Sequence, residues 1–129
     1  MEDLVIGLKG EKTLCVNEYT TALALGSGGL EVLGTPALAA LMEGAAFELA
    51  QAHLPAGTST VGTRLELDHL AATPLGMQVT AKAEVIAVEG RKLVFAIEAR
   101  DHRELVGKAV HERFMVQIDK FMSKAQAKL

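Results

Sequence analysis

The longest patterned stretch of the sequence is TPALAALMEGAAFELAQAH, residues 35–53. Its apolar residues recur three and four positions apart, which predicts one long amphipathic helix. Thr35 is an expected N-cap, Pro36 suits the first helical position, and LPAG at 54–57 ends the pattern. The core-facing stripe is expected to contain Leu38, Leu41, Met42, Ala45, Leu49 and Ala52.

The segments around this helix have the period of strands. Residues 58–71, 78–88, 93–100 and 105–118 alternate apolar and polar side chains, with short turns at 73–77, 89–92 and 101–104. They predict an antiparallel meander in which the TPLG turn brings the next strand back beside His69. A weaker strand is expected at 13–20 and a short helix at 119–129, where three lysines form a solvated stripe. The glycines at 26–29 predict either a loop or a lid.

These elements predict one α+β domain over residues 1–129, in which a five-stranded antiparallel sheet covers a single long helix. The composition is globular, with 50% apolar residues and 4% aromatic residues. A formal charge of −3 without a dense basic cluster argues against nucleic acid as a partner. No apolar run is long enough for a membrane span, and the acidic start of the chain is unlike a signal peptide, which predicts a cytoplasmic protein. Cys15, the only cysteine, is expected to be a small buried residue on a strand.

Three polar residues lie where the pattern calls for apolar surroundings. His69 falls on the strand face of Val61, Thr63, Leu65 and Leu67, where a buried structural histidine is as common as a catalytic one. Glu43 has mostly apolar neighbours one turn away on its helix, so it either faces solvent or needs a partner from elsewhere. His69 would be a suitable partner. Thr35 would add a hydroxyl at the helix N-terminus, where developing negative charge is stabilised.

Other chemical motifs are weak. His53, His102 and His111 lack metal-ligand spacing, and the sequence contains no HExxH, GxSxG, P-loop or GxGxxG pattern, so neither a metal nor a redox cofactor is expected. His111 and Arg113 share a strand face. Arg113 could bind an anion, although an ion pair with a neighbouring acid is the more common role.

Four stretches, in this order, resemble the hotdog-fold thioesterases and among them the fluoroacetyl-CoA thioesterase group. They are EVLGTPALAALMEGAAFELA, VGTRLELDHLAATPLGMQVT, VEGRKL and HERF, within residues 31–121. The resemblance implies a homodimer or dimer of dimers, joined edge to edge by its sheets with sites at the interface. It also implies catalytic roles for Thr35, Glu43 and His69, and contact of Gly62 with the acyl group or the thioester oxygen. Simple alternation puts Gly62 on the face opposite His69, so a bulge or a backbone role is required.

The resulting hypothesis is a hydrolase that cleaves a small acyl-CoA to the free acid and CoA. His69 would be the general base, Thr35 would position the reacting groups, and Glu43 would either assist His69 or attack the carbonyl. Arg113 joins Gly62 as a substrate-binding candidate. The alternative is an acyl-CoA or small-ligand binding module without turnover. The group's fluoroacetyl-CoA enzyme carries a phenylalanine-bearing lid before the helix, whereas this chain reads GSGGLEVL, which favours a different small acyl group.

Overall fold

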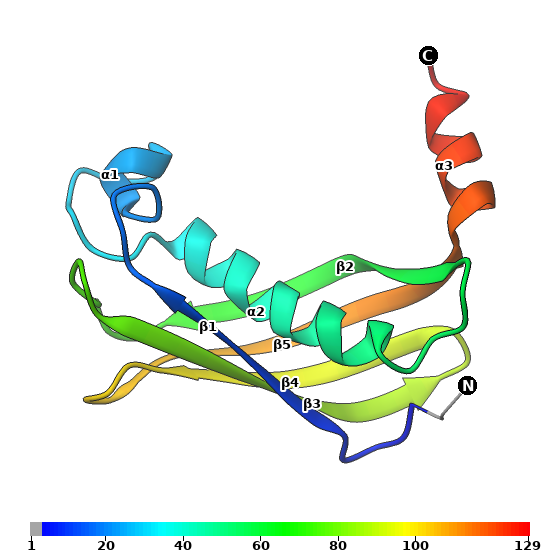
Figure 1. The fold of residues 1–129 in the computed structure, drawn as a ribbon, viewed down its shortest axis with the longest axis horizontal. Coiled ribbons are helices and arrows are strands. Elements are labelled where there is room, and N and C mark those ends of the chain that lie inside the picture. The colour runs from blue at the N-terminus through cyan, green and yellow to red at the C-terminus, as the bar shows by residue number, and fades with distance from the viewer. Residues whose placement is uncertain (1–3) are drawn as a thin grey trace.

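The computed structural model describes residues 4–129, and within them one long helix crosses a curved antiparallel sheet (Figure 1). The strand order is β1-β3-β4-β5-β2, which confirms the predicted five-stranded α+β architecture. The elements in chain order are β1 (Lys9–Cys15), α1 (Ala22–Leu25), α2 (Thr35–Gln51), β2 (Thr58–His69), β3 (Gln78–Glu89), β4 (Lys92–Arg100), β5 (Leu105–Gln117) and α3 (Ile118–Gln126).

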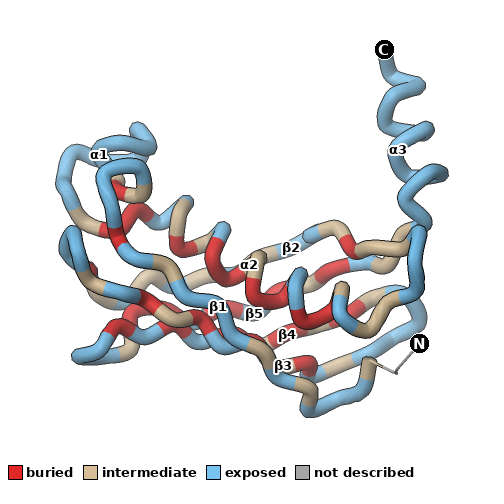
Figure 2. The backbone as a smooth tube through the Cα atoms, in the orientation of Figure 1, coloured by how far each residue is buried: buried red, intermediate tan, exposed pale blue. Residues whose placement is uncertain are grey.

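The core lies between α2 and the face of the sheet beneath it. Buried positions follow the side of α2 that faces the strands (Figure 2). The predicted stripe is confirmed except at Ala52, which is exposed because the helix ends one residue earlier. The buried helix residues are Leu38, Leu41, Met42, Ala45, Ala46, Leu49 and Ala50, packed on strand residues such as Val79, Val85, Leu93, Phe95 and Ile97.

The predicted meander is wrong in one connection. β3, β4 and β5 follow one another, but β2 pairs with β5 at one edge of the sheet, so β3 does not lie beside His69. The segment 70–77 instead crosses toward β1, where the amides of Val16 and Gly76 bond the carbonyls of Met77 and Val16 at 2.9 and 2.8 Å. These contacts between distant segments have no signature in local alternation.

The first strand begins earlier than predicted and ends at Cys15 rather than at residue 20. Val16 is buried and Cys15 is exposed, since neighbouring strand residues point to opposite sides. The expectation of a buried cysteine was therefore wrong.

A bulge between Gly62 and Arg64 divides β2 into two registers. Before the bulge, Thr60 is buried at 4% exposure; after it, Leu65, Leu67 and His69 are the less exposed positions. Thr60 and Gly62 thus share a face with His69, whereas the simple alternation had assigned Val61 and Thr63 to it. The bulge required by the position of Gly62 is confirmed.

The two small helices lie at the periphery. α1 is a single turn whose cap, Gly26, has φ 73°, and the predicted glycine-rich segment follows it. α3 has no buried residue and projects from the end of β5 (Figure 1). In residues 4–129 no helix is both long and apolar enough to cross a membrane. The acidic start of the chain, residues 1–3, lies outside the described residues.

Asp101 links the turn after β4 to the segment after His69. Its carboxylate accepts bonds from the amides of Arg103 and Glu104 at 2.8 and 3.0 Å and from the Thr73 hydroxyl at 3.1 Å. Burial opposes ionisation, but these three bonds outweigh it and hold the pKa of Asp101 below its ordinary value of 3.8.

Asp101→Asn is expected to lower the free energy of unfolding by about 1 to 3 kcal/mol at neutral pH. A lowered native pKa contributes stability that is present above the unfolded pKa and is lost as pH falls through the native one. The difference from wild type should therefore be constant above about pH 5 and shrink below pH 4 in urea titrations. The exposed Glu98→Gln is the matched control; a difference unchanged down to pH 2 would contradict the assignment.

Candidate active site

The hydroxyl of Thr35 and the imidazole of His69 meet at one end of α2, with Oγ1 and Nδ1 2.7 Å apart. The chain holds both residues there, since the Leu33 amide just before the helix bonds the Thr73 carbonyl just after β2 at 2.9 Å. Gly107 faces His69 across the β2–β5 pair. A Cβ at Gly107 would lie 2.9 Å from Leu38, so glycine allows α2 to sit close to the sheet here.

Thr35 is not the N-cap that was predicted. Gly34 occupies that position with extended backbone angles, Thr35 is the first helical residue, and no side chain caps the helix. The Ala37 and Leu38 amides both donate to the Gly34 carbonyl at 3.0 Å, and Pro36 has no N–H. The Thr35 hydroxyl is therefore available to His69, while the helix offers few amides to an anion.

Burial lowers the pKa of His69 from its ordinary 6.5, with an opposing contribution from the Ala71 backbone. Nε2 itself is buried without a hydrogen-bond partner in the described residues. The ring is consequently neutral near pH 7 and able to accept a proton.

Glu43 belongs to a second group of polar side chains, gathered around Gly62. A Cβ at Gly62 would lie 3.1 Å from Arg113 Nη1, 3.2 Å from His111 Cε1 and 3.4 Å from Glu43 Oε1. A side chain at Gly62 would therefore crowd a cation, an imidazole and a carboxylate, and glycine lets these three groups approach the β2 backbone closely. Gly62 itself is exposed.

Arg113 has no carboxylate within 4.0 Å among the described residues, so the predicted default of an ion pair is wrong. It is only 6% exposed and is held by hydrogen bonds. Nε and Nη2 donate to the Thr60 hydroxyl and carbonyl at 2.8 and 3.0 Å, and Cζ lies 5.6 Å from the Phe47 ring centroid. Burial lowers the pKa of Arg113 and the charge of Glu43 opposes this, but a guanidinium keeps its proton.

The proposed pairing of Glu43 with His69 does not occur within one chain. No ion pair joins them in residues 4–129, and Glu43 lies eight residues beyond Thr35, about 12 Å along the helix axis. The chain therefore carries two separate groups of candidate residues, which we call half-sites. One contains Thr35 and His69, and the other contains Glu43, Gly62 and Arg113.

Comparison with known proteins identifies the family. Residues 16–119 match the fluoroacetyl-CoA-specific thioesterases. The fluoroacetyl-CoA thioesterase of Streptantibioticus cattleyicolor is 37% identical over 98 residues, which cover 76% of this chain and 70% of that protein. The chain belongs to this family.

Solved structures of a fluoroacetyl-CoA-specific thioesterase show how closely the family fold is kept. A variant of that enzyme superposes with a TM-score of 0.94 at 30% identity over 100% of both chains. A second variant, crystallised with acetyl-CoA, gives a TM-score of 0.92 at 30% identity over 97% of this chain and 98% of that one. The helix wrapped by a five-stranded sheet is the hotdog fold expected from the resemblance.

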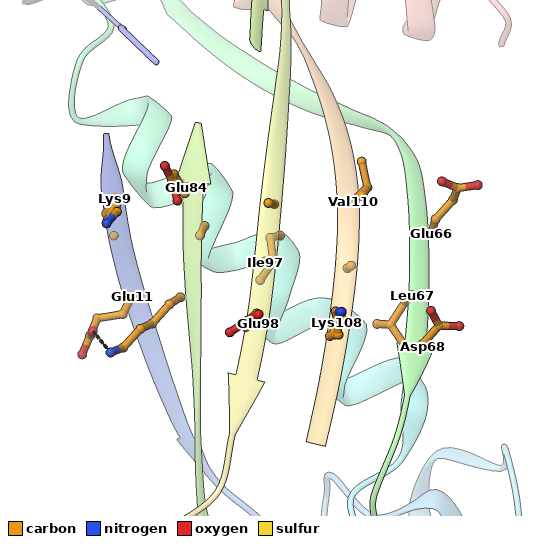
Figure 3. Close-up of a pocket in the computed structure, with 15 residues that line it drawn as sticks. Lys9, Glu11, Glu66, Leu67, Asp68, Glu84, Ile97, Glu98, Lys108 and Val110 are labelled. Atoms are coloured by element: carbon orange, nitrogen blue, oxygen red, sulfur yellow. Dashed lines mark ion pairs between the residues drawn. The ribbon is translucent and has the colours of Figure 1, made fainter. Parts of the chain in front are cut away.

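A wide groove on the described chain lies away from both half-sites. It has a volume of about 1050 Å³ and covers the face of the sheet opposite α2 (Figure 3). Its charged side chains have both signs, and one ion pair crosses it, Lys82 to Glu11 at 3.9 Å. None of the five predicted site residues lines this groove.

The sequence pattern predicted no site role for Thr60 or His111. His111 is 1% exposed and contacts Arg113, and Thr60 supplies two of the three hydrogen bonds of that guanidinium. The HERF motif contained a signal, since His111 and Arg113 alternate onto one strand face. Thr60 could not be found in this way, because the bulge reverses its face.

Proposed function

We propose that this protein hydrolyses the thioester of a small acyl-CoA, and the single observation that carries the proposal is the 2.7 Å contact between Thr35 and His69. A neutral, half-buried histidine paired with an exposed hydroxyl can accept a proton at neutral pH. The named activity of its relative, on fluoroacetyl-CoA, supports a small acyl-CoA as the substrate. The acetyl-CoA bound to a variant of the crystallised thioesterase supports the same class.

Water attacks the thioester carbonyl while its proton passes through the Thr35 hydroxyl to Nδ1 of His69. The carbonyl carbon gains a C–O bond, and its C–S bond then breaks. His69 returns the proton to the departing thiolate, so one water and one thioester give one acid and one free CoA thiol. No step requires a metal or a redox group.

Stabilisation of the oxyanion falls to Gly62 and Arg113, since the first amides of α2 already bond Gly34. Gly62 is exposed and Arg113 Nη1 lies beside it, so the thioester oxygen docks against the Gly62 backbone near this cation. Glu43 lies on the same side of Gly62 and accepts the second hydrogen bond of the attacking water, which fixes the direction of attack.

A homodimer completes the site. β2 is an edge strand that pairs only with β5 among the described strands, so its outer edge is free to pair with a second copy. Antiparallel pairing of two β2 edges about a two-fold axis at Glu66 would set Leu65 of one copy opposite Leu67 of the other and, because of the extra residue in the bulge, would bring Gly62 of one copy close to His69 of the other. Thr35 and His69 of one subunit then face Glu43, Gly62 and Arg113 of its partner, and each dimer has two sites.

The acyl group is small and aliphatic. The segment that covers the start of α2 carries leucines rather than phenylalanines, and Leu23, Leu25 and Leu30 are exposed at 54%, 43% and 71%. A C–F bond gains nothing specific from such side chains, so acetyl and short alkyl esters are expected to turn over at least as well as fluoroacetyl-CoA. The glycines at 26–29 let this segment act as a lid. We place the enzyme in the cytoplasm, since a single cysteine gives no sign of an oxidising compartment.

The direct test is release of free CoA thiol from a panel of acetyl-, fluoroacetyl-, propionyl-, butyryl- and hexanoyl-CoA. Hydrolysis of the short esters, lost in His69→Ala, is the expected result. Tight binding of the esters without thiol release would instead establish the binding module, the alternative function. Equal turnover of all chain lengths would contradict a small acyl pocket.

A further inference from the structure

His111 has a single tautomer that is compatible with its neighbours. Its Nδ1 lies 2.7 Å from the carbonyl of Arg64, at the end of the bulge in β2. A carbonyl only accepts, so Nδ1 must carry the hydrogen. Nε2 lies 3.2 Å from Nη1 of Arg113, which only donates, so Nε2 must be the bare nitrogen.

The surroundings keep this ring neutral. Burial lowers the pKa of His111, and the charge of Arg113 acts in the same direction. The Arg64 carbonyl and the carboxylates of Glu43 and Glu112 oppose the shift without reversing it. A proton on Nε2 would place two donors and two positive charges against each other in a buried site.

Three of the five N–H groups of Arg113 are therefore assigned. Thr60 accepts from Nε and Nη2, His111 accepts from Nη1, and Phe47 lies near the guanidinium. One hydrogen on each Nη remains, and Nη1 lies beside Gly62. The hydrogen bonds that fix the direction of this buried cation all go to neutral acceptors, and the carboxylate of Glu43 lies on the same side of Gly62.

We propose that His111 is a positioning residue: as the Nδ1–H tautomer fixed by the bulge carbonyl of Arg64, it aims the guanidinium of Arg113 at the Gly62 backbone, beside which the thioester oxygen develops charge. This role rests on the proposed hydrolase function, and His111 itself touches no substrate. The bulge thus has two effects, since it exposes Gly62 to the substrate and supplies the carbonyl that selects the tautomer.

Two substitutions test the roles of the two ring nitrogens of His111 separately. In His111→Gln the amide can present its oxygen where Nε2 was, whereas His111→Asn reaches only the Arg64 carbonyl. His111→Asn is expected to lower kcat on acetyl-CoA about tenfold with a smaller change in KM, and His111→Gln to stay within about threefold of wild type. In an Arg113→Met background the same His111→Asn change should have little further effect. Equal losses of kcat in His111→Asn and His111→Gln would overturn the proposal. So would an undiminished loss of kcat when His111→Asn is made in the Arg113→Met background.

A measurement without substrate separates this proposal from the proposed function. Long-range proton–nitrogen NMR at pH 7.5 should show a protonated Nδ1 and a bare Nε2 for His111, and the slowly exchanging Nε–H of Arg113 should persist in His111→Gln and broaden in His111→Asn. An Nε2–H or doubly protonated ring would overturn the assignment. If wild type hydrolyses no acyl-CoA, the proposed function fails while this spectrum still decides whether His111 fixes Arg113. Thermal midpoints of both variants report any purely structural loss.

Discussion

His69→Ala is expected to lower kcat/KM for acetyl-CoA by about 10²- to 10⁴-fold, the range lost when a general base is removed. The reason is the contact of Nδ1 with the Thr35 hydroxyl, which has no other basic group beside it in the described chain. His102→Ala, at an exposed turn position, is the matched control and should leave kcat/KM unchanged. Turnover that survives His69→Ala would show that the catalytic assignment is wrong while the reaction class stands.

The pH profile gives the same residue a second test. Because burial lowers the pKa of His69, the free base persists as pH falls through 6.5, and kcat/KM should decline only below that value. This acidic limb should disappear in the residual activity of His69→Ala. A limb centred above 6.5 would contradict the burial of the ring.

Glu43→Gln is expected to lower kcat by about 10²- to 10³-fold while changing KM little, since its carboxylate orients the attacking water and the amide cannot replace both acceptors. Glu48→Gln, on the same helix but exposed and paired with Lys12 at 2.6 Å, is the control. The chemistry of Glu43 can be resolved by single turnover in ¹⁸O-labelled water. Label in Glu43 would show that Glu43 attacks first and that water opens the anhydride at the Glu43 carboxyl carbon. Label confined to the released acid, with no Glu43 anhydride trapped by hydroxylamine, is the result expected for direct attack by water.

Local sequence pattern determined the helix and most strands well. Residues 35–53 have one dominant period, so the helix and its buried stripe could be predicted almost to the residue. The order of strands could not, because the contacts of residues 70–77 with Val16 and Leu33 join segments far apart in the chain. A one-residue bulge likewise leaves no trace in alternation except a misplaced glycine.

The candidate site residues stood out in the sequence because each was out of place in its pattern. His69 interrupted an apolar face and Glu43 stood among apolar helix neighbours, and the structure places each in one of two polar groups. Their direct partnership could not be judged from sequence, since alternation fixes a face but not a position along it. Arg113 illustrates the same limit, because its neutral partners Thr60 and His111 depend on the register across the bulge.

Mixing two inactive variants tests most directly whether the site is shared between subunits. Glu43→Ala and His69→Ala protein, unfolded together at equal amounts and refolded, should recover about a quarter of wild-type activity, because half of the dimers are mixed and each has one intact site of two. Each variant refolded alone should stay inactive. Mixed dimers that form, as judged by native mass spectrometry, but recover no activity would contradict a site built from two chains.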